Sequence, residues 1–97
     1  MQWATVVRKC DLVSGVFSSL GHPVRIKILC KLMEGEQSVN ELTGFCDIPQ
    51  PAMSQFLSRM KEDGLVEARR HGRFVRYRIA DARLKALMAA TRKVYCR

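Results

Sequence analysis

Long hydrophobic runs are absent from this sequence. The longest uninterrupted apolar stretch is residues 86–90, whereas a helix that crosses a membrane needs about 20 apolar residues. The first twenty residues also lack the apolar block and the small-residue cleavage site of a signal peptide, because Arg8 and Lys9 interrupt them. These absences predict a cytoplasmic protein that does not cross a membrane.

Closely spaced metal ligands are missing as well. No two of the four cysteines form a Cys-x-x-Cys pair, and the two histidines lie near none of them in the sequence. Small zinc sites use such closely spaced ligands, and disulfide scaffolds belong to exported chains. We therefore predict no bound metal, no cofactor and no structural disulfide, and we leave thiol chemistry open.

Acidic residues are scarce in the second part of the chain. Residues 1–57 carry five basic and five acidic side chains, whereas residues 58–97 carry twelve basic and four acidic ones and hold the whole net charge of +8. A one-sided basic surface on a small domain attracts a polyanion. Since 97 residues suffice for one domain, the composition predicts a single domain, 1–97, that binds nucleic acid.

Apolar residues three or four positions apart predict helices along most of the chain. They span about 3–20, Pro23 to just before Gly35, Ser38 to just before Asp47, Pro51 to Asp63, and about 81–97. Ser38 and Asp81 are the expected N-caps. In the short third helix we expect Val39, Leu42 and Phe45 to face inward.

After Gly64 the apolar period changes to two, which is typical of strands. Residues 65–70 and 73–79 flank His71 and Gly72 and predict a β-hairpin. The fold class is therefore mainly α with a β-hairpin wing: a winged helix-turn-helix, with the two helices at about 38–63 and the wing at about 65–79.

The helix that ends at Asp63 has a polar side that is poor in acid. In a helix-turn-helix the second helix enters the major groove of DNA, and its polar side chains reach the bases. The wing adds five arginines against one acid over residues 67–78, which favours contact with phosphates. The polar side of the helix consists of Gln50, Ser54, Gln55, Ser58 and Arg59.

Five segments together resemble the ArsR/SmtB family of winged-helix repressors. They are LGHPVR at 20–25, GEQSVNEL at 35–42, QPAMSQFL at 50–57, EDGLV at 62–66 and GRFVRYR at 72–78. The resemblance implies a homodimer whose first and last helices, about 3–20 and 81–97, pair across a two-fold axis. It also implies binding to an inverted repeat in double-stranded DNA and release by an inducer.

The resemblance also assigns roles to individual positions. It implies that Gln50, Ser54 and Gln55 face base edges, and that Arg73, with Arg69 and Arg70, holds phosphates or the minor groove. The arsenic and cadmium sensors of the family have cysteines where this chain has Ser38 and Asn40, and the zinc motif of the last helix needs histidines that residues 81–97 lack. The usual metal pockets of the family are thus without their ligands.

One branch of the family responds to sulfide and persulfides and controls sulfide oxidation, biofilm growth or haemolysin genes. The chain resembles this branch at Cys30 and Cys96. In that branch the reduced dithiol form binds DNA, and reactive sulfur species link the two thiols and release the repressor. Considered alone, Cys30 lies on an apolar stripe where an inert thiol is the default, whereas Cys96 is expected to be exposed beside Lys93.

The main prediction is a transcriptional repressor released from its operator when persulfide, polysulfide or an oxidant links Cys30 and Cys96. Cys10 is then expected in the dimer interface and Cys46 in the core. A second hypothesis replaces the signal by a thiophilic metal or arsenite. A third, a persulfide-transferring enzyme, is disfavoured because no cysteine has a recognisable base or oxyanion partner. A fourth is a module that binds RNA or protein and has inert cysteines.

Overall fold

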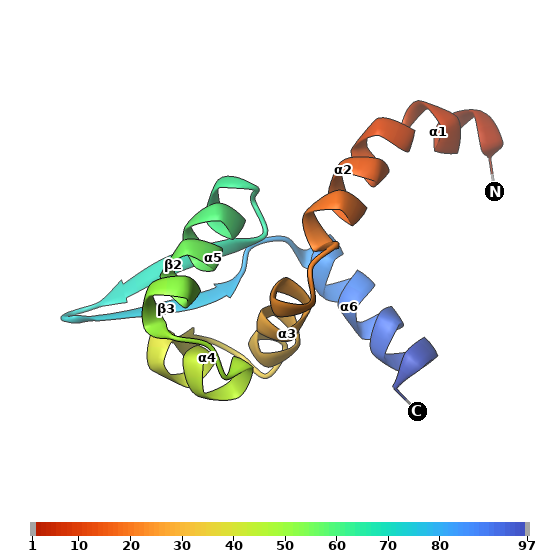
Figure 1. Ribbon diagram of the computed structural model, residues 1–97. Helices are drawn as coiled ribbons and strands as arrows, with labels where there is room; N and C mark the ends of the chain where they lie inside the picture. The colour runs from red at the N-terminus through yellow and green to blue at the C-terminus, as the bar shows by residue number, and fades with distance from the viewer. Residues whose placement is uncertain (1, 97) are drawn as a thin grey trace.

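A computed structural model describes residues 2–96 of the chain (Figure 1). Helices form both ends of the chain, and the three strands and the remaining helices lie between them. The elements are α1 (Trp3–Arg8), α2 (Cys10–Leu20), α3 (Pro23–Leu32), β1 (Gln37–Ser38), α4 (Val39–Cys46), α5 (Gln50–Glu62), β2 (Val66–His71), β3 (Phe74–Ile79) and α6 (Ala82–Tyr95). This is the predicted winged helix-turn-helix, with α4 and α5 as the helix pair and β2–β3 as the wing.

Side-chain caps begin three of the helices, two of them at the predicted residues Ser38 and Asp81 and one at His22, which was not predicted as a cap. The Ser38 hydroxyl accepts the backbone N–H of Glu41 at 3.1 Å and donates to the Glu41 carboxylate at 3.2 Å. Asp81 Oδ1 accepts the N–H of Arg83 at 2.8 Å, and His22 Nδ1 accepts the N–H of Val24 at 3.1 Å. Each bond satisfies a backbone donor that a helix leaves unpaired in its first turn.

The residues between α4 and α5 explain the tight turn that joins the two helices. Asp47 adopts the left-handed conformation with φ 56°, which Asp tolerates better than most side chains. Pro49 precedes α5 without a side-chain cap. The recognition helix α5 therefore begins directly after a tight turn, and the position of that turn fixes where α5 starts.

The sheet differs from the predicted hairpin in two ways. It has three antiparallel strands in the order β1-β3-β2, and the two-residue β1 was not predicted because so short a strand leaves no periodicity in a sequence. The hairpin turn is Gly72–Arg73, since His71 pairs with Phe74. It was predicted one residue earlier, but Gly72 takes φ 64°, and the first position of such a turn favours glycine.

The core lies between α3, α4, α5 and the base of the wing. The predicted inward residues of α5, Met53, Leu57 and Met60, are fully buried. In α4 the prediction for Phe45 is wrong, because Phe45 is 49% exposed, whereas the prediction for Cys46 is confirmed, because Cys46 is buried at 4%. The short α4 packs Leu42 and Cys46, four positions apart, against α3.

Two helical arms extend from this core (Figure 1). The first was predicted as one helix over about 3–20, which is wrong: Lys9 separates α1 from α2 and donates its N–H to both Thr5 O and Val6 O. The second, α6, ends at Tyr95, so Cys96 follows the helix, and Arg97 lies outside the described residues. Among residues 2–96 no helix is long and apolar enough to span a membrane.

Candidate DNA-binding surface and thiol groups

The outward side of α5 carries the polar residues that the sequence predicted on one side of this helix, among them Gln50, Ser54 and Gln55, which were predicted to face base edges. All five are exposed, and they recur at spacings of four or five positions, which places them on one side of the helix. The opposite side holds Met53, Leu57 and Met60 in the core. The rigid core thus presents the exposed row Gln50, Ser54, Gln55, Ser58 and Arg59.

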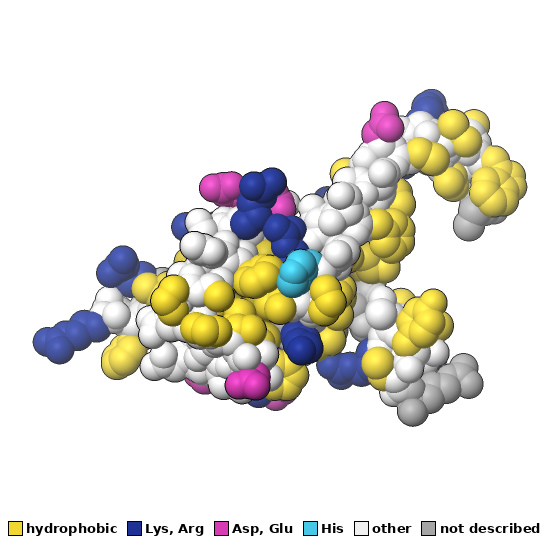
Figure 2. Space-filling view, viewed as in Figure 1, with side chains coloured by type: hydrophobic (Ala, Val, Ile, Leu, Met, Phe, Trp, Pro, Cys, Tyr) yellow, Lys and Arg dark blue, Asp and Glu magenta, His cyan; other side chains and the backbone are white. Residues whose placement is uncertain are grey.

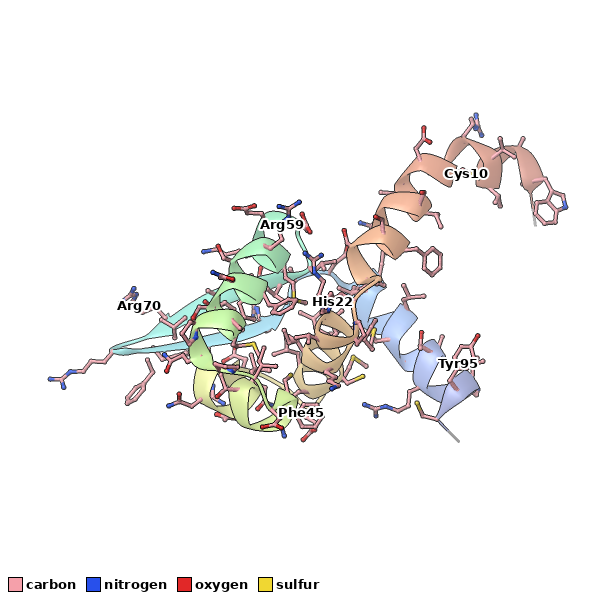
Figure 3. All side chains as sticks on the ribbon, viewed as in Figure 1. Cys10, His22, Phe45, Arg59, Arg70 and Tyr95 are labelled. Atoms are coloured by element: carbon pink, nitrogen blue, oxygen red, sulfur yellow. The ribbon has the colours of Figure 1, made fainter. Side chains whose placement is uncertain are left out.

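A ring contact supports α5 from the side of α3. Phe56 is half-buried and packs against the core, with its ring centroid 4.9 Å from that of His22. Arg25 binds Asp63 at 3.1 Å and the Ser19 carbonyl at 2.8 Å, and Arg59 lies 3.7 Å from Asp63. These contacts tie the recognition helix to the start of α3, as the positions of His22 and Arg59 in Figure 3 illustrate.

Glu36, in the loop before β1, lies close to three cationic side chains of the wing. Its carboxylate lies 3.7 Å from Arg69, 3.3 Å from His71 Nε2 and 3.9 Å from Arg76. Arg76 also donates to the Glu36 carbonyl at 2.9 Å and lies 3.4 Å from Glu41. Sequence reasoning missed Glu36, because its partners lie more than thirty positions away and only the β1–β3 pairing brings them together.

The wing arginines therefore fall into two groups. Arg69, Arg76 and Arg78 have acidic partners, the last of them Glu67 on the neighbouring strand. Arg70 and Arg73 have none among residues 2–96, and both are exposed near the hairpin turn. Figure 3 shows Arg70 far out on the wing, well apart from Arg59 on α5. The predicted residues thus form two separate regions, a polar row on α5 and a basic region on the wing.

The four thiols occupy different environments and all are free. Cys30 is half-buried on α3 at the edge of the core, and Cys96 is exposed after the last turn of α6. Burial raises the pKa of the Cys46 thiol, an effect that Lys27 opposes and Cys30 reinforces. Cys10 is exposed on the N-terminal arm, far from the core (Figure 3). Within the described residues no three metal-ligating side chains come together.

Comparison with known proteins identifies the family of this chain. The model for bacterial regulatory proteins of the arsR family matches residues 22–68. Over 89 residues the chain is 37% identical to the biofilm growth-associated repressor of Xylella fastidiosa, and the aligned segment covers 92% of this chain and 78% of that protein. The chain belongs to the arsR family. This ArsR-family chain is also 32% identical over 81 residues to the transcriptional activator HlyU of Vibrio cholerae, covering 84% of this chain and 75% of that protein.

Solved structures of ArsR-family proteins have the same fold. The transcriptional repressor BigR from Xylella fastidiosa matches with a TM-score of 0.92 at 35% identity and covers 100% of this chain and 99% of its own. The homodimeric winged helix-turn-helix domain Mb0332 from Mycobacterium bovis matches with a TM-score of 0.79 at 33% identity, covering 91% and 82%. The predicted branch is confirmed, since these relatives are the biofilm-associated and HlyU regulators, and none of the relatives named here is an enzyme.

Proposed function

We propose that this ArsR-family regulator binds an operator as a homodimer, inserting α5 into the major groove and laying the wing on the flanking backbone. The observation that carries the DNA part is the exposed, acid-poor row on α5 beside a wing whose Arg70 and Arg73 have no acidic partner in residues 2–96. Amide and hydroxyl side chains read base edges in the major groove, and unpaired arginines bind phosphates.

Two apolar arms support the homodimer. Side chains on α2 and α6 enclose a groove of about 490 Å³ that remains open to solvent. Phe17 is 59% exposed there, and Trp3 on α1 is 72% exposed, so these arms leave apolar surface that a single subunit does not cover (Figure 2). A second copy of the chain covers it in the proposed dimer. The groove is lined on its apolar side by Leu12, Val13, Val16, Phe17, Leu65, Leu84 and Leu87.

In the proposed switch, reactive sulfur species link Cys30 to Cys96. The support is the uneven attachment of α6: Leu84 and Met88 are buried, whereas Val94 and Tyr95 are 64% and 83% exposed. The last turn is therefore held weakly and ends at an exposed thiol. A link to Cys30 on α3 would pull this turn against the core and shift the dimer arm, which changes the spacing of the two α5 helices.

Titration of labelled operator DNA tests the DNA surface. Gln55→Ala should cost about 1–3 kcal/mol on the operator and relax base preference, because a base contact is lost. Arg73→Ala should weaken binding to all sequences and flatten the salt dependence by about one unit of slope. Lys85→Ala, an exposed change on α6, is the control. Variants of Gln55 and Arg73 that bind like the parent chain would contradict the assignment.

Treatment with glutathione persulfide tests the thiol switch. Cys30→Ser and Cys96→Ser should both bind the operator in the reduced state and stay bound after treatment, whereas the parent chain is released. Cys10→Ser is the matched control and should be released like the parent chain. Peptide mapping should find Cys30 joined to Cys96 through sulfur. Release of the Cys30→Ser variant by the persulfide would contradict the switch, and release by arsenite or cadmium alone would favour a metal signal.

A further inference from the structure

Cys46 was expected to be an ordinary core residue, but it has a second thiol as a neighbour. Cys46 is the last residue of α4, and Cys30 lies in the last turn of α3. Both side chains pack into the same apolar cluster, where Cys46 is 4% exposed and Cys30 is half-buried at the edge. Each cysteine therefore faces the boundary between the same two packed helices.

Contacts of the flanking residues locate the two cysteines relative to each other. Lys31, which follows Cys30, places its Nζ 5.3 Å from the ring centroid of Phe45, which precedes Cys46. The charge of a Cys30 thiolate also acts on Cys46 and helps to raise its pKa. The packing of α4 on α3 thus brings the segment that holds Cys30 against the segment that holds Cys46.

We propose that Cys30 and Cys46 form a second dithiol within one subunit, which closes to a disulfide when Cys30 is oxidised. This extends the proposed function, in which Cys30 is the reactive thiol, and gives Cys30 a choice between two partners. Cys30 is the thiol that meets the oxidant, because it is partly exposed, whereas Cys46 is buried and out of contact with solvent. Cys46 is then the resolving thiol.

The chemistry balances with a persulfide as oxidant. Cys30 first takes the outer sulfur from the donor persulfide, which leaves as a thiol, and becomes a Cys30 persulfide. The Cys46 sulfur then attacks Cys30 Sγ, the bond from Sγ to the outer sulfur breaks, and hydrosulfide leaves and takes up the Cys46 proton as hydrogen sulfide. Two thiols lose two electrons in total, and the transferred sulfur is reduced to sulfide.

The two links of Cys30 would act on different parts of the molecule. Cys46 immediately precedes Asp47, whose left-handed backbone makes the turn into α5. A Cys30–Cys46 bond therefore ties α3 to the turn that sets the recognition helix within a single subunit. A Cys30–Cys96 link acts on the exposed end of α6 instead.

The double variant Cys10→Ser/Cys96→Ser isolates the pair, since it removes only the two exposed thiols. The folded protein is treated with diamide, whose N=N bond takes the two thiol hydrogens, and is then blocked with N-ethylmaleimide before unfolding and digestion. The expected result is loss of both titratable thiols per subunit and a peptide pair that joins Cys30 to Cys46 within one chain. Cys30→Ser/Cys96→Ser, which keeps Cys10 and Cys46, is the matched control and should form no intrachain bond.

Recovery of Cys30 and Cys46 as separate alkylated peptides, or only of bonds between chains, would overturn the proposal. Diamide requires no sulfur transfer, so this result is independent of the proposed persulfide response. A parent chain that links Cys30 to Cys96 with persulfide, while the double variant forms no bond with diamide, would overturn the second dithiol and leave the proposed function standing. If the double variant forms the Cys30–Cys46 bond with diamide, while the parent chain forms no Cys30–Cys96 link with persulfide, the second dithiol stands and the proposed persulfide response is overturned.

Discussion

At the scale of single residues, the chemistry of this protein depends on which charges and thiols have partners. The arginines of the wing look alike in the sequence, yet Arg69 and Arg76 share the Glu36 carboxylate, while Arg70 and Arg73 have no acidic partner in residues 2–96. An arginine already paired with a carboxylate must give up that pair before it binds a phosphate. In the proposed complex Glu36 would therefore compete with DNA for Arg69 and Arg76.

Removing the charge of Glu36 should strengthen DNA binding. Glu36→Gln frees Arg69 for phosphate contact and leaves Arg76 with Glu41 as its remaining acidic partner, so affinity should rise several-fold, and the slope of log K against log salt should steepen by about one unit for each cation that gains a phosphate. Fluorescence anisotropy over a range of salt concentrations measures both quantities.

Glu34→Gln is the matched control for Glu36. Glu34 lies two positions away and contacts Lys31 on α3 at 3.4 Å, with no contact to the wing. Glu34→Gln removes the same negative charge as Glu36→Gln, so any difference in DNA affinity between the two variants comes from a local effect. Equal gains in affinity for both variants would show that net charge, and not competition for the wing, is the cause.

At the scale of secondary-structure elements, helix ends decide how firmly each helix is held. The cap at Ser38 and the left-handed residue Asp47 fix both ends of α4. Helix α6 begins at Asp81, whose carboxylate accepts the N–H of Arg83 and binds its guanidinium at 2.7 Å. The Arg83 contacts hold the pKa of Asp81 below its usual value of 3.8.

The low pKa of Asp81 makes the stability of α6 depend on pH. The folded state holds the carboxylate ionised, so its contribution is fully present above the usual aspartate pKa of 3.8 and is lost as the pH falls through the lower folded value. Asp81→Asn keeps an oxygen acceptor for the cap but loses the charge. Its melting temperature should fall below that of the parent chain at pH 6, and the gap should close under strongly acidic conditions.

Glu62→Gln provides the control for Asp81. Glu62 ends α5 and has no ion pair among residues 2–96, so its neutralisation should leave the melting temperature near that of the parent chain at pH 6. Thermal unfolding followed by circular dichroism distinguishes the two. A gap between Asp81→Asn and the parent chain that stays constant down to acidic pH would contradict the role of the charge.

At the scale of the whole molecule, the two helical arms leave an apolar groove of the subunit uncovered. The chain has extents of 48 × 30 × 21 Å, and the long dimension comes from the α1–α2 arm and the wing, which extend from opposite ends of the core (Figure 1). The apolar groove between α2 and α6 is open. A partner subunit that covers this groove would also fix the distance between two recognition helices.

Phe17→Glu should disrupt the dimer without unfolding the subunit. Phe17 is 59% exposed, so a charge there costs little in the isolated subunit but would be buried and unpaired in the dimer. Sedimentation should show a monomer, and affinity for a two-site operator should fall far more than affinity for a half-site. Ser14→Glu, a charge placed at an exposed polar position of the same helix, is the control. A Phe17→Glu protein that remains dimeric would refute this interface.

The sequence by itself determined the elements whose signals are local. Caps at Ser38 and Asp81, the apolar spacing of Met53, Leu57 and Met60, and the period of two after Gly64 are carried by neighbouring residues, and they sufficed for the fold class. The exposed row on α5 also follows from spacing alone, because one helix places its residues on fixed sides. The break at Lys9 and the exposure of Phe45 depend on packing, and local periodicity did not predict them.

Only the tertiary structure decided which distant residues meet. Glu36 joins the wing because β1 pairs with β3, and the segments that hold Cys30 and Cys46 meet because α4 packs on α3. Neither pairing leaves a pattern in the sequence, since the partners are separated by loops whose course depends on the whole core. The fold class was thus set by local chemistry, whereas the pairing of charges and thiols was set by how the elements pack.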